Sequence, residues 1–343
     1  MGSIMYRYRL KSCVWEITLK CCFSCKYCGS KAGVARENEL STEECLSVAR
    51  QLIDLGCQRV SLIGGEVFMR DDWTTIVKCL TDGGVKVSII TNGYLFSENM
   101  ISQLKKLNVE SVAISVDGAQ EIHDSFRHKG SFGRAIKAID VLTENHIPVS
   151  VISTLHSKNV SCLDELYGVL KQKRIFAWQL QACSPMGNAL EGFSTEIDFS
   201  QVIRFVEEHL GNSPFVIGIA DNIGYYVESE GVLRGNTSGK AVFNGCRAGL
   251  TSIGIDSVGN VRGCESMYDA VFIEGNLRKD TLAEIWNNPN SFSYNRKFSM
   301  ENLQGKCRHC EYATKCAGGC RSYNYFTHKK MYESLYCVKQ TKG

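Results

Sequence analysis

Three cysteines near the start of the chain could hold a metal cluster. Cys21, Cys25 and Cys28 stand in the spacing C-x3-C-x2-C. Thiolates are soft ligands that suit iron–sulfur clusters or zinc, and three of them on one short loop could hold three irons of a cubane and leave the fourth iron open. A zinc site would normally require a fourth protein ligand close by. The spacing therefore favours an iron–sulfur cluster, both over zinc and over the buried, unreactive thiols that free cysteines often are.

A second group of cysteines occupies the last third of the chain. Its seven members are Cys246, Cys264, Cys307, Cys310, Cys316, Cys320 and Cys337. The compact C-x2-C-x5-C-x3-C part of this group, taken by itself, is typical of a structural zinc site. Iron–sulfur ligation is the alternative, and these residue types alone leave both open.

Alternating strands and helices are predicted to position the first cysteine group. Short apolar runs rich in β-branched residues predict strands at 14–19, 59–63, 85–90, 111–116, 149–153 and 176–181. Amphipathic segments between them predict helices, such as 41–55 with Ser41 as a suitable N-cap. This alternation indicates parallel βα units in a partial barrel, where chemistry collects at the carboxyl ends of the strands.

The loops that leave these strands carry further candidate residues. They are Gly64, Gly65, Glu66, Asn92, Ser115, Arg127 and Cys183. Glycines let backbone groups approach a ligand closely, and Glu66 supplies an anionic acceptor for an ammonium group. Arg127 can bind a carboxylate through two parallel hydrogen bonds, with a surface arginine as the alternative. Cys183 could face a substrate or be a packed thiol.

The first cysteine loop resembles the cluster loop of the radical SAM superfamily. That family has the same spacing and usually an aromatic residue before the third cysteine, where this chain has Tyr27. The resemblance implies a [4Fe-4S] cluster whose open iron is chelated by S-adenosylmethionine (SAM). It also implies an external electron donor such as flavodoxin or ferredoxin.

The motif Gly64-Gly65-Glu66 resembles the GGE motif of the same family, which binds the amino group of SAM. The family usually has proline next, where this chain has Val67; that difference removes no ligand. By resemblance, Ser115 and Arg127 belong to elements that contact the ribose and carboxylate of SAM, and Asn92 is expected to face the same site.

The seven C-terminal cysteines resemble the SPASM domain, an extension of radical SAM enzymes that mature peptides and proteins. The resemblance covers about residues 246–337 and implies two auxiliary clusters of the [4Fe-4S] type. The outer cluster is expected on Cys307, Cys310, Cys316 and Cys337, and the inner cluster on Cys246, Cys264 and Cys320. Since no cysteine lies between Cys183 and Cys246, the inner cluster should have an iron open to an outside ligand. A substrate thiolate would bind it; water, a carboxylate or a smaller cluster are the alternatives.

Glu265, directly after Cys264, is a candidate catalytic residue together with Cys183. Formylglycine-forming members of the family place an acid at this position, which implies that Glu265 takes a proton during substrate oxidation. A solvated surface glutamate is the alternative.

The sequence therefore predicts an α/β protein with a partial (β/α)6 barrel of the radical SAM type over residues 1–240. A small cysteine-rich SPASM domain is expected over residues 241–343. The resemblance implies a maturase that generates a 5′-deoxyadenosyl radical, abstracts hydrogen from a ribosomally made peptide and forms a thioether or carbon–carbon crosslink. Formylglycine formation on a protein cysteine or serine is the alternative within the family. A zinc-binding interaction module is the alternative from another class.

Composition excludes several other classes of protein. The net charge of the 343 residues is only +3, and no basic block suggests a nucleic-acid partner. No apolar run approaches the roughly 20 residues of a membrane-spanning helix. The chain has 17 cysteines within long helix and strand patterns, which indicates thiolate ligands in a reducing cytoplasm and not a secreted disulfide framework.

Overall fold

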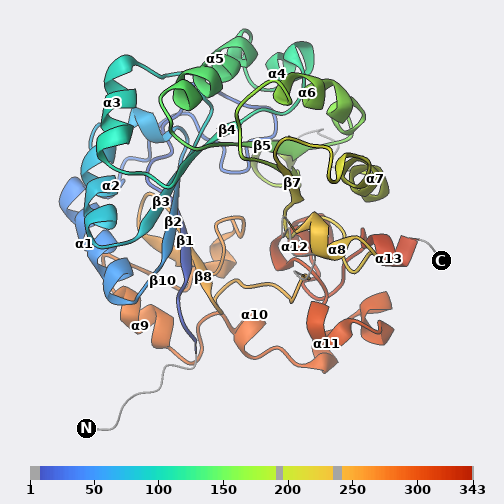
Figure 1. Ribbon diagram of the computed structural model, residues 1–343. Helices are drawn as coiled ribbons and strands as arrows, with labels where there is room; N and C mark the ends of the chain where they lie inside the picture. The colour runs from blue at the N-terminus through green and yellow to red at the C-terminus, as the bar shows by residue number, and fades with distance from the viewer. Residues whose placement is uncertain (1–7, 191–195, 235–241, 342–343) are drawn as a thin grey trace.

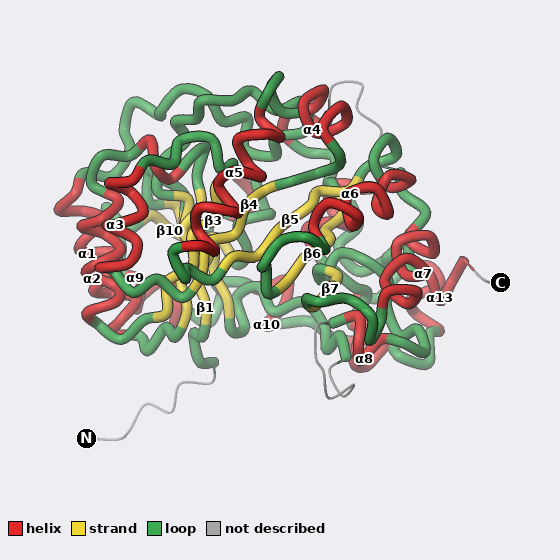
Figure 2. The backbone as a smooth tube through the Cα atoms, turned by 45° about the horizontal axis from the view of Figure 1, so that its top comes forward, coloured by secondary structure: helices red, strands yellow, loops and turns green. Residues whose placement is uncertain are grey.

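The computed structural model describes residues 8–190, 196–234 and 242–341 (Figure 1). Within them, the strands form one ten-stranded sheet in the order β10-β9-β8-β1-β2-β3-β4-β5-β6-β7. The strands are β1 (Ser12–Glu16), β2 (Arg59–Ile63), β3 (Lys86–Thr91), β4 (Ser111–Ser115), β5 (Val149–Leu155), β6 (Ala177–Ala182), β7 (Val216–Ile219), β8 (Ser252–Ile255), β9 (Asn260–Arg262) and β10 (Gly275–Asn276). The sheet is curved, and Figure 2 shows the same curvature from a second direction.

Helices connect the strands and follow the last of them along the chain. They are α1 (Thr42–Asp54), α2 (Trp73–Asp82), α3 (Glu98–Lys106), α4 (Gln120–Phe126), α5 (Ser131–Glu144), α6 (Leu163–Leu170), α7 (Phe199–His209), α8 (Glu230–Leu233), α9 (Leu282–Asn287), α10 (Ser293–Arg296), α11 (Ala313–Cys316), α12 (Arg321–His328) and α13 (Val338–Thr341). In Figure 1, helices α1, α2, α3 and α5 lie outside the strands, whereas α8 and α13 lie on the side of β7.

Local sequence explains how these helices form and pack. At the start of α1, the Ser41 hydroxyl accepts the Glu44 N–H and the Glu44 carboxylate accepts the Ser41 N–H, which is a capping box. The buried residues of α1 include Val48 and Leu52, spaced so that one apolar stripe packs into the core. The same pattern repeats in the following helices, and one continuous apolar core joins them to the sheet.

Parallel pairing continues without interruption from β1 to β7. The sheet also extends in the other direction, because β8 pairs in parallel with β1, with Trp15 opposite Ile255. Strands β9 and β10 then add in antiparallel fashion. The predicted α/β fold class is confirmed. The predicted domain boundary at 240/241 lies outside the described residues and stays a prediction, but the two predicted domains share one sheet.

Three details differ from the sequence-based expectation. Strand β1 ends at Glu16, and three residues later the Leu19 N–H donates to the Glu39 carboxylate (2.6 Å). The segment between β4 and β5, where one amphipathic helix is expected, forms two helices, α4 and α5. Strand β7 was not predicted, since its four residues are too few to show a clear alternation. No helix in the described ranges has both the length and the apolar character needed to cross a bilayer.

Candidate active site

A cavity of about 660 Å³ lies inside the curved sheet and reaches the loops at the strand ends. Inward-facing polar residues of the strands, such as Ser61, Ser88 and Gln179, line one part of it. The sequence-predicted residues that line it are Cys21, Cys25, Cys28, Gly64, Gly65, Asn92, Ser115, Arg127, Cys183, Cys264 and Glu265. The cavity therefore joins the first cysteine loop with part of the C-terminal cysteine group.

The loop of Cys21, Cys25 and Cys28 is held by backbone hydrogen bonds. The Cys21 N–H donates to Gly33 O (2.9 Å) and the Cys28 N–H to Cys25 O (3.2 Å). Burial raises the pKa of the Cys25 thiol to about 11, and coordination to a metal would remove its proton. Among the described residues, no three thiol, imidazole or carboxylate groups converge closely enough to hold a single metal ion. Three thiols from one short loop at the cavity wall fit the predicted cluster site.

The Gly64-Gly65-Glu66 turn packs directly against the start of the cysteine loop. The Gly65 N–H donates to Thr18 O (2.9 Å), and the Glu66 N–H donates to Lys20 O (2.7 Å). A Cβ atom on Gly65 would lie 2.1 Å from Lys20 O. Glycine is therefore required here, because the backbone of Lys20 lies too close to leave room for a side chain.

Glu66 lies behind the cavity wall and is fully buried. Its carboxylate accepts hydrogen bonds from the Thr91 hydroxyl (2.7 Å) and the Asn92 N–H (2.9 Å). Burial raises the pKa of Glu66 to about 7, and these hydrogen bonds oppose that rise. The Asn92 side chain, in turn, donates to the Cys22 thiol (3.4 Å). Glu66 thus ties the end of β3 to the cysteine loop.

Arg127 forms a buried ion pair with Asp117 through its Nε atom. The Tyr27 hydroxyl donates to the same carboxylate, as does the Thr154 N–H (2.8 Å). Burial alone would raise the pKa of Asp117, but the charge of Arg127 lowers it below its usual range. The structure gives the two terminal nitrogens of Arg127 no hydrogen bond to the described residues, so they can bind a carboxylate in the cavity.

Cys183 and Ser115 also lie at the cavity, at the ends of β6 and β4. Cys183 is buried in a small cluster with Tyr27, Phe126 and Ala189. Burial raises the pKa of its thiol to about 12. Cys183 is thus a protonated thiol that both packs in this cluster and faces the cavity.

Glu265 is buried and lies at the cavity, not on the solvated surface. Neither of its carboxyl oxygens has a hydrogen-bond partner in the described part of the chain. Burial and then the charge of Glu16 hold the pKa of Glu265 well above its usual range. Glu16 itself is bound by the Arg36 guanidinium and the Tyr268 hydroxyl. At the inner end of the cavity, the Glu16 carboxylate is therefore hydrogen-bonded, whereas the Glu265 carboxyl group has no hydrogen-bond partner among the described residues.

Sequence reasoning did not identify Glu16, Arg36 or Tyr268. Arg36 also donates to the Tyr268 hydroxyl and to Ser257, so the network joins β1 to residues beyond β8. The available signal was Glu16 itself, a charged residue within the apolar run Val14-Trp15-Glu16-Ile17. A buried charge in such a run requires a partner, but the partners lie far away in the sequence.

The cysteines predicted for the inner auxiliary cluster lie together. Cys246 lies near enough to Cys264 for a thiolate at Cys246 to raise the pKa of Cys264. Thiolates at Cys246 and Cys264 would likewise raise the pKa of Cys320. Burial and then the charge of Cys246 raise the pKa of Cys264 to about 11. Because Cys264 also lines the large cavity, the predicted inner cluster site borders the predicted SAM site.

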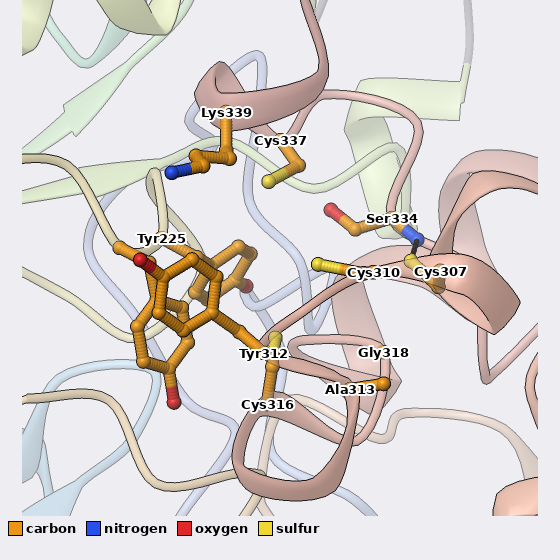
Figure 3. A pocket seen from close by; sticks show the side chains of 11 residues that line it. Tyr225, Cys307, Cys310, Tyr312, Ala313, Cys316, Gly318, Ser334, Cys337 and Lys339 are labelled. Carbon is orange, nitrogen blue, oxygen red and sulfur yellow. Dashed lines mark hydrogen bonds between the residues drawn. The ribbon is translucent and has the colours of Figure 1, made fainter.

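The cysteines predicted for the outer cluster surround a separate pocket (Figure 3). It is lined by Cys307, Cys310, Cys316 and Cys337, with Tyr225, Tyr312 and Lys339 on one side. Tyr226 lines it as well. The ring centroids of Tyr226 and Tyr312 are 4.2 Å apart in a stacked arrangement. The Ser334 N–H donates to the Cys307 sulfur (3.4 Å), a bond that would support a thiolate ligand. Four thiols around one pocket fit a fully ligated cluster.

Comparison with known proteins agrees with this geometry. Residues 15–170 match the radical SAM superfamily, and residues 246–311 match SPASM, an iron-sulfur cluster-binding domain. The chain is 29% identical over 339 residues to AdoMet-dependent heme synthase from Methanosarcina barkeri, covering 94% of this chain and 95% of the relative. It is 27% identical over 316 residues to mycofactocin maturase MftC from Mycolicibacterium smegmatis, covering 91% and 78%.

Solved structures share the fold. Streptococcus suis SuiB bound to S-adenosylmethionine has a TM-score of 0.78 at 17% identity, covering 96% of this chain and 78% of that chain. Native anSMEcpe with bound AdoMet has a TM-score of 0.74 at 18% identity, covering 96% and 95%. Together with the cysteine sites, these matches establish an enzyme that uses SAM and iron–sulfur clusters. The chain belongs to the radical SAM superfamily and carries a C-terminal SPASM domain.

Proposed function

We propose that this enzyme modifies a ribosomally made peptide by abstracting hydrogen from one of its side chains, and that a thioether or carbon–carbon crosslink results. The size of the cavity is the observation that carries this proposal. A pocket of roughly 300–1,000 Å³ holds one drug-sized ligand, and this one measures about 660 Å³. With SAM inside, the remaining space suits one or two side chains of a substrate whose other parts stay outside.

The lining of the cavity supports a peptide. Its strand side carries neutral hydroxyl and amide groups: Ser61, Ser88, Ser111, Ser150, Thr154, Gln179 and Gln181. Such groups can bind the N–H and C=O groups of an inserted peptide segment without requiring a charged substrate. The mycofactocin maturase relative supports the same class of substrate.

Each predicted site residue has a proposed task. When bound, the cluster and SAM supply a carbon-centred radical that removes a hydrogen atom from the substrate. Arg127, held by Asp117, binds the SAM carboxylate, and Gly64 and Gly65 present backbone groups to the SAM amino group. Glu66 orients Asn92, and Ser115 contacts the ligand from β4.

Two further residues are proposed to act on the substrate. Glu265 would hold or move the proton released when the substrate is oxidised, because its carboxyl group is unpaired and borders the cavity. Cys183 would contact the substrate from β6. The inner set of three cysteines would leave an iron able to bind a substrate thiolate, which favours carbon–sulfur bond formation over formylglycine formation.

A porphyrin substrate is the second candidate, because the heme synthase relative matches nearly the full length of both chains. Recognition of several porphyrin carboxylates would call for several cations. Among the described residues that line the cavity, Arg127 is the one cation, and Glu16 and Glu265 are acidic. This charge balance favours a peptide.

Both candidates can be tested in one experiment. The anaerobically reconstituted enzyme is given SAM, a reductant and either the small peptide encoded nearest to its gene or a porphyrin precursor of heme. We expect 5′-deoxyadenosine and a peptide lighter by two hydrogens. Loss of this product when a substrate cysteine is replaced by serine indicates a thioether, and its persistence indicates a carbon–carbon crosslink. Heme formation without any change in the peptide would contradict the proposal, and an aldehyde on the peptide would indicate formylglycine.

The cellular setting is also a proposal. An open-iron cluster is sensitive to oxygen, so we infer a reducing cytoplasm, with flavodoxin or ferredoxin as the electron donor. Replacing the chemical reductant by either carrier and its reductase should sustain 5′-deoxyadenosine formation.

A further inference from the structure

Arg321 is a buried cation at the start of α12, directly after the cysteine Cys320. Its side chain is among the largest that are fully buried, with 1% of the residue exposed. Its guanidinium stacks on Tyr332, with the ring centroid 4.5 Å away, and lies 5.2 Å from the ring of Phe298. A buried charge in such apolar surroundings is costly unless an opposite charge compensates it.

The hydrogen bonds of Arg321 do not supply that opposite charge. Its Nη1 donates to the carbonyl oxygens of Ala317 (2.5 Å), Met331 (3.2 Å) and Gly319 (3.4 Å). Its Nε is buried without a partner in the described part of the chain. All three of these described acceptors are uncharged backbone carbonyls, and none is a carboxylate.

Arg321 instead lies beside cysteines of both auxiliary sites. It directly follows Cys320 of the inner set, and its Nη1 donates to the carbonyl oxygen of Ala317, the residue after Cys316 of the outer set. Clusters bound by thiolates carry net negative charge, and their reduction potentials depend on nearby charge and hydrogen bonds. Arg321 thus has an Nε–H without an acceptor in the described part of the chain and a positive charge without an opposite charge there. Negatively charged clusters bound at these sites would supply both.

We propose that Arg321 is the shared counter-charge of the two auxiliary clusters and raises both of their reduction potentials. One-electron reduction adds a negative charge to a cluster, and a fixed cation in a low-dielectric interior stabilises that reduced state. Arg321 would thus make both auxiliary centres better electron acceptors. This inference rests on the cluster sites and not on which substrate is modified.

The test is a redox titration of the reconstituted holoenzyme, followed by electron paramagnetic resonance. Arg321→Gln keeps hydrogen-bond donors for the carbonyls but removes the charge, and Arg321→Lys keeps the charge. At a fixed potential, we expect Arg321→Gln to lower the reduced-to-oxidised ratio of both auxiliary centres about tenfold, which is 59 mV for one electron. Arg321→Lys should stay close to the wild type, and the SAM-binding cluster should not change in either variant.

Arg296→Gln is the matched control. Arg296 also donates to backbone carbonyls, of Gly249 (2.7 Å) and Trp286 (2.6 Å), and stacks on aromatic rings. Its described backbone acceptors, Gly249, Trp286 and Asn288, are not next to a cysteine in the sequence. Its replacement should leave the auxiliary potentials unchanged.

Each outcome of the redox titration either supports or refutes the role of Arg321 as a counter-charge. If Arg321→Gln fails to retain auxiliary iron while Arg321→Lys retains it at wild-type potentials, the charge is required and the proposal holds. If both variants lose the auxiliary clusters, the guanidinium serves only to hold the carbonyls, and the proposal is wrong. Unchanged potentials in Arg321→Gln, or equal shifts in Arg321→Gln, Arg321→Lys and Arg296→Gln, would also refute it.

Discussion

Replacing Gly65 by alanine should displace the cysteine loop that we propose to hold the SAM-binding cluster. The new Cβ atom would lie 2.1 Å from Lys20 O, 2.5 Å from Lys20 C and 2.6 Å from Leu19 O. Non-bonded heavy atoms normally approach to about 3.5 Å, so the backbone must move by roughly 1 Å. Lys20 directly precedes Cys21, and its carbonyl also accepts the Glu66 N–H. The displacement therefore reaches a cluster ligand.

The expected effects follow from that displacement. Overpacking a rigid site costs about 1–3 kcal/mol of stability, and a misplacement of about 1 Å at a reacting centre can cost about 100-fold in rate. Gly65→Ala should therefore fold but form 5′-deoxyadenosine about 100-fold more slowly under reductant. Iron content and the rate of SAM cleavage are the measurements.

Gly33→Ala is the matched control for this prediction. Gly33 contacts the same segment, since its N–H donates to Leu19 O (3.1 Å). A Cβ atom on Gly33 would meet no atom within 4 Å. We expect near-normal SAM cleavage in this variant. Equal rates for Gly65→Ala, Gly33→Ala and the wild type would refute the steric explanation of the glycine motif.

Three further predictions concern the cluster, the substrate and pH. Replacing Cys21, Cys25 and Cys28 together by alanine should abolish 5′-deoxyadenosine formation while circular dichroism still shows the folded barrel; residual SAM cleavage would disprove the assignment. Glu265→Gln should block the final product but preserve 5′-deoxyadenosine formation, and a normal product yield would remove Glu265 from the mechanism. Burial lowers the pKa of His123 to about 4, below the unfolded value of about 6.5. The unfolded chain then binds more protons between these values, so about 3 kcal/mol of stability, present above pH 6.5, should be lost as the pH falls to 4. His123→Gln should flatten this part of the profile of unfolding free energy against pH, whereas the exposed His146→Asn should leave it unchanged.

Much of the fold and of the site could be predicted because the signals are local. Each predicted strand from 14–19 to 176–181 has a counterpart in the sheet, with ends shifted by a few residues. The first cysteine group is recognisable from its spacing, because Cys21, Cys25 and Cys28 lie on one short loop. The strand-end residues gather at one cavity because parallel strands direct their carboxyl ends to the same side.

The remaining features depend on contacts between distant parts of the chain. Nothing near Glu16 in the sequence indicates Tyr268, yet the two side chains are hydrogen-bonded. Likewise, the motif predicts that Glu66 contacts a ligand. In the structure its carboxylate accepts hydrogen bonds from Thr91 and Asn92 at the end of β3. In the sequence Arg321 is only a basic residue after a cysteine. Its role is suggested by the structure, in which its side chain is buried and its described acceptors are backbone carbonyls and not carboxylates.

The parallel pairing of β8 with β1 sets how the two cluster regions face each other. The first cysteine loop leaves β1, while the segment of Cys264 and Glu265 packs against β8. Gly254 on β8 permits this packing, since a Cβ atom there would lie 2.4 Å from the Glu265 nitrogen and 2.8 Å from the Cys264 carbonyl carbon. Gly254 stands opposite Val14 of β1 in the register of the sheet. The pairing of β1 with β8 therefore sets how the first cysteine loop and the segment of Cys264 and Glu265 lie relative to each other.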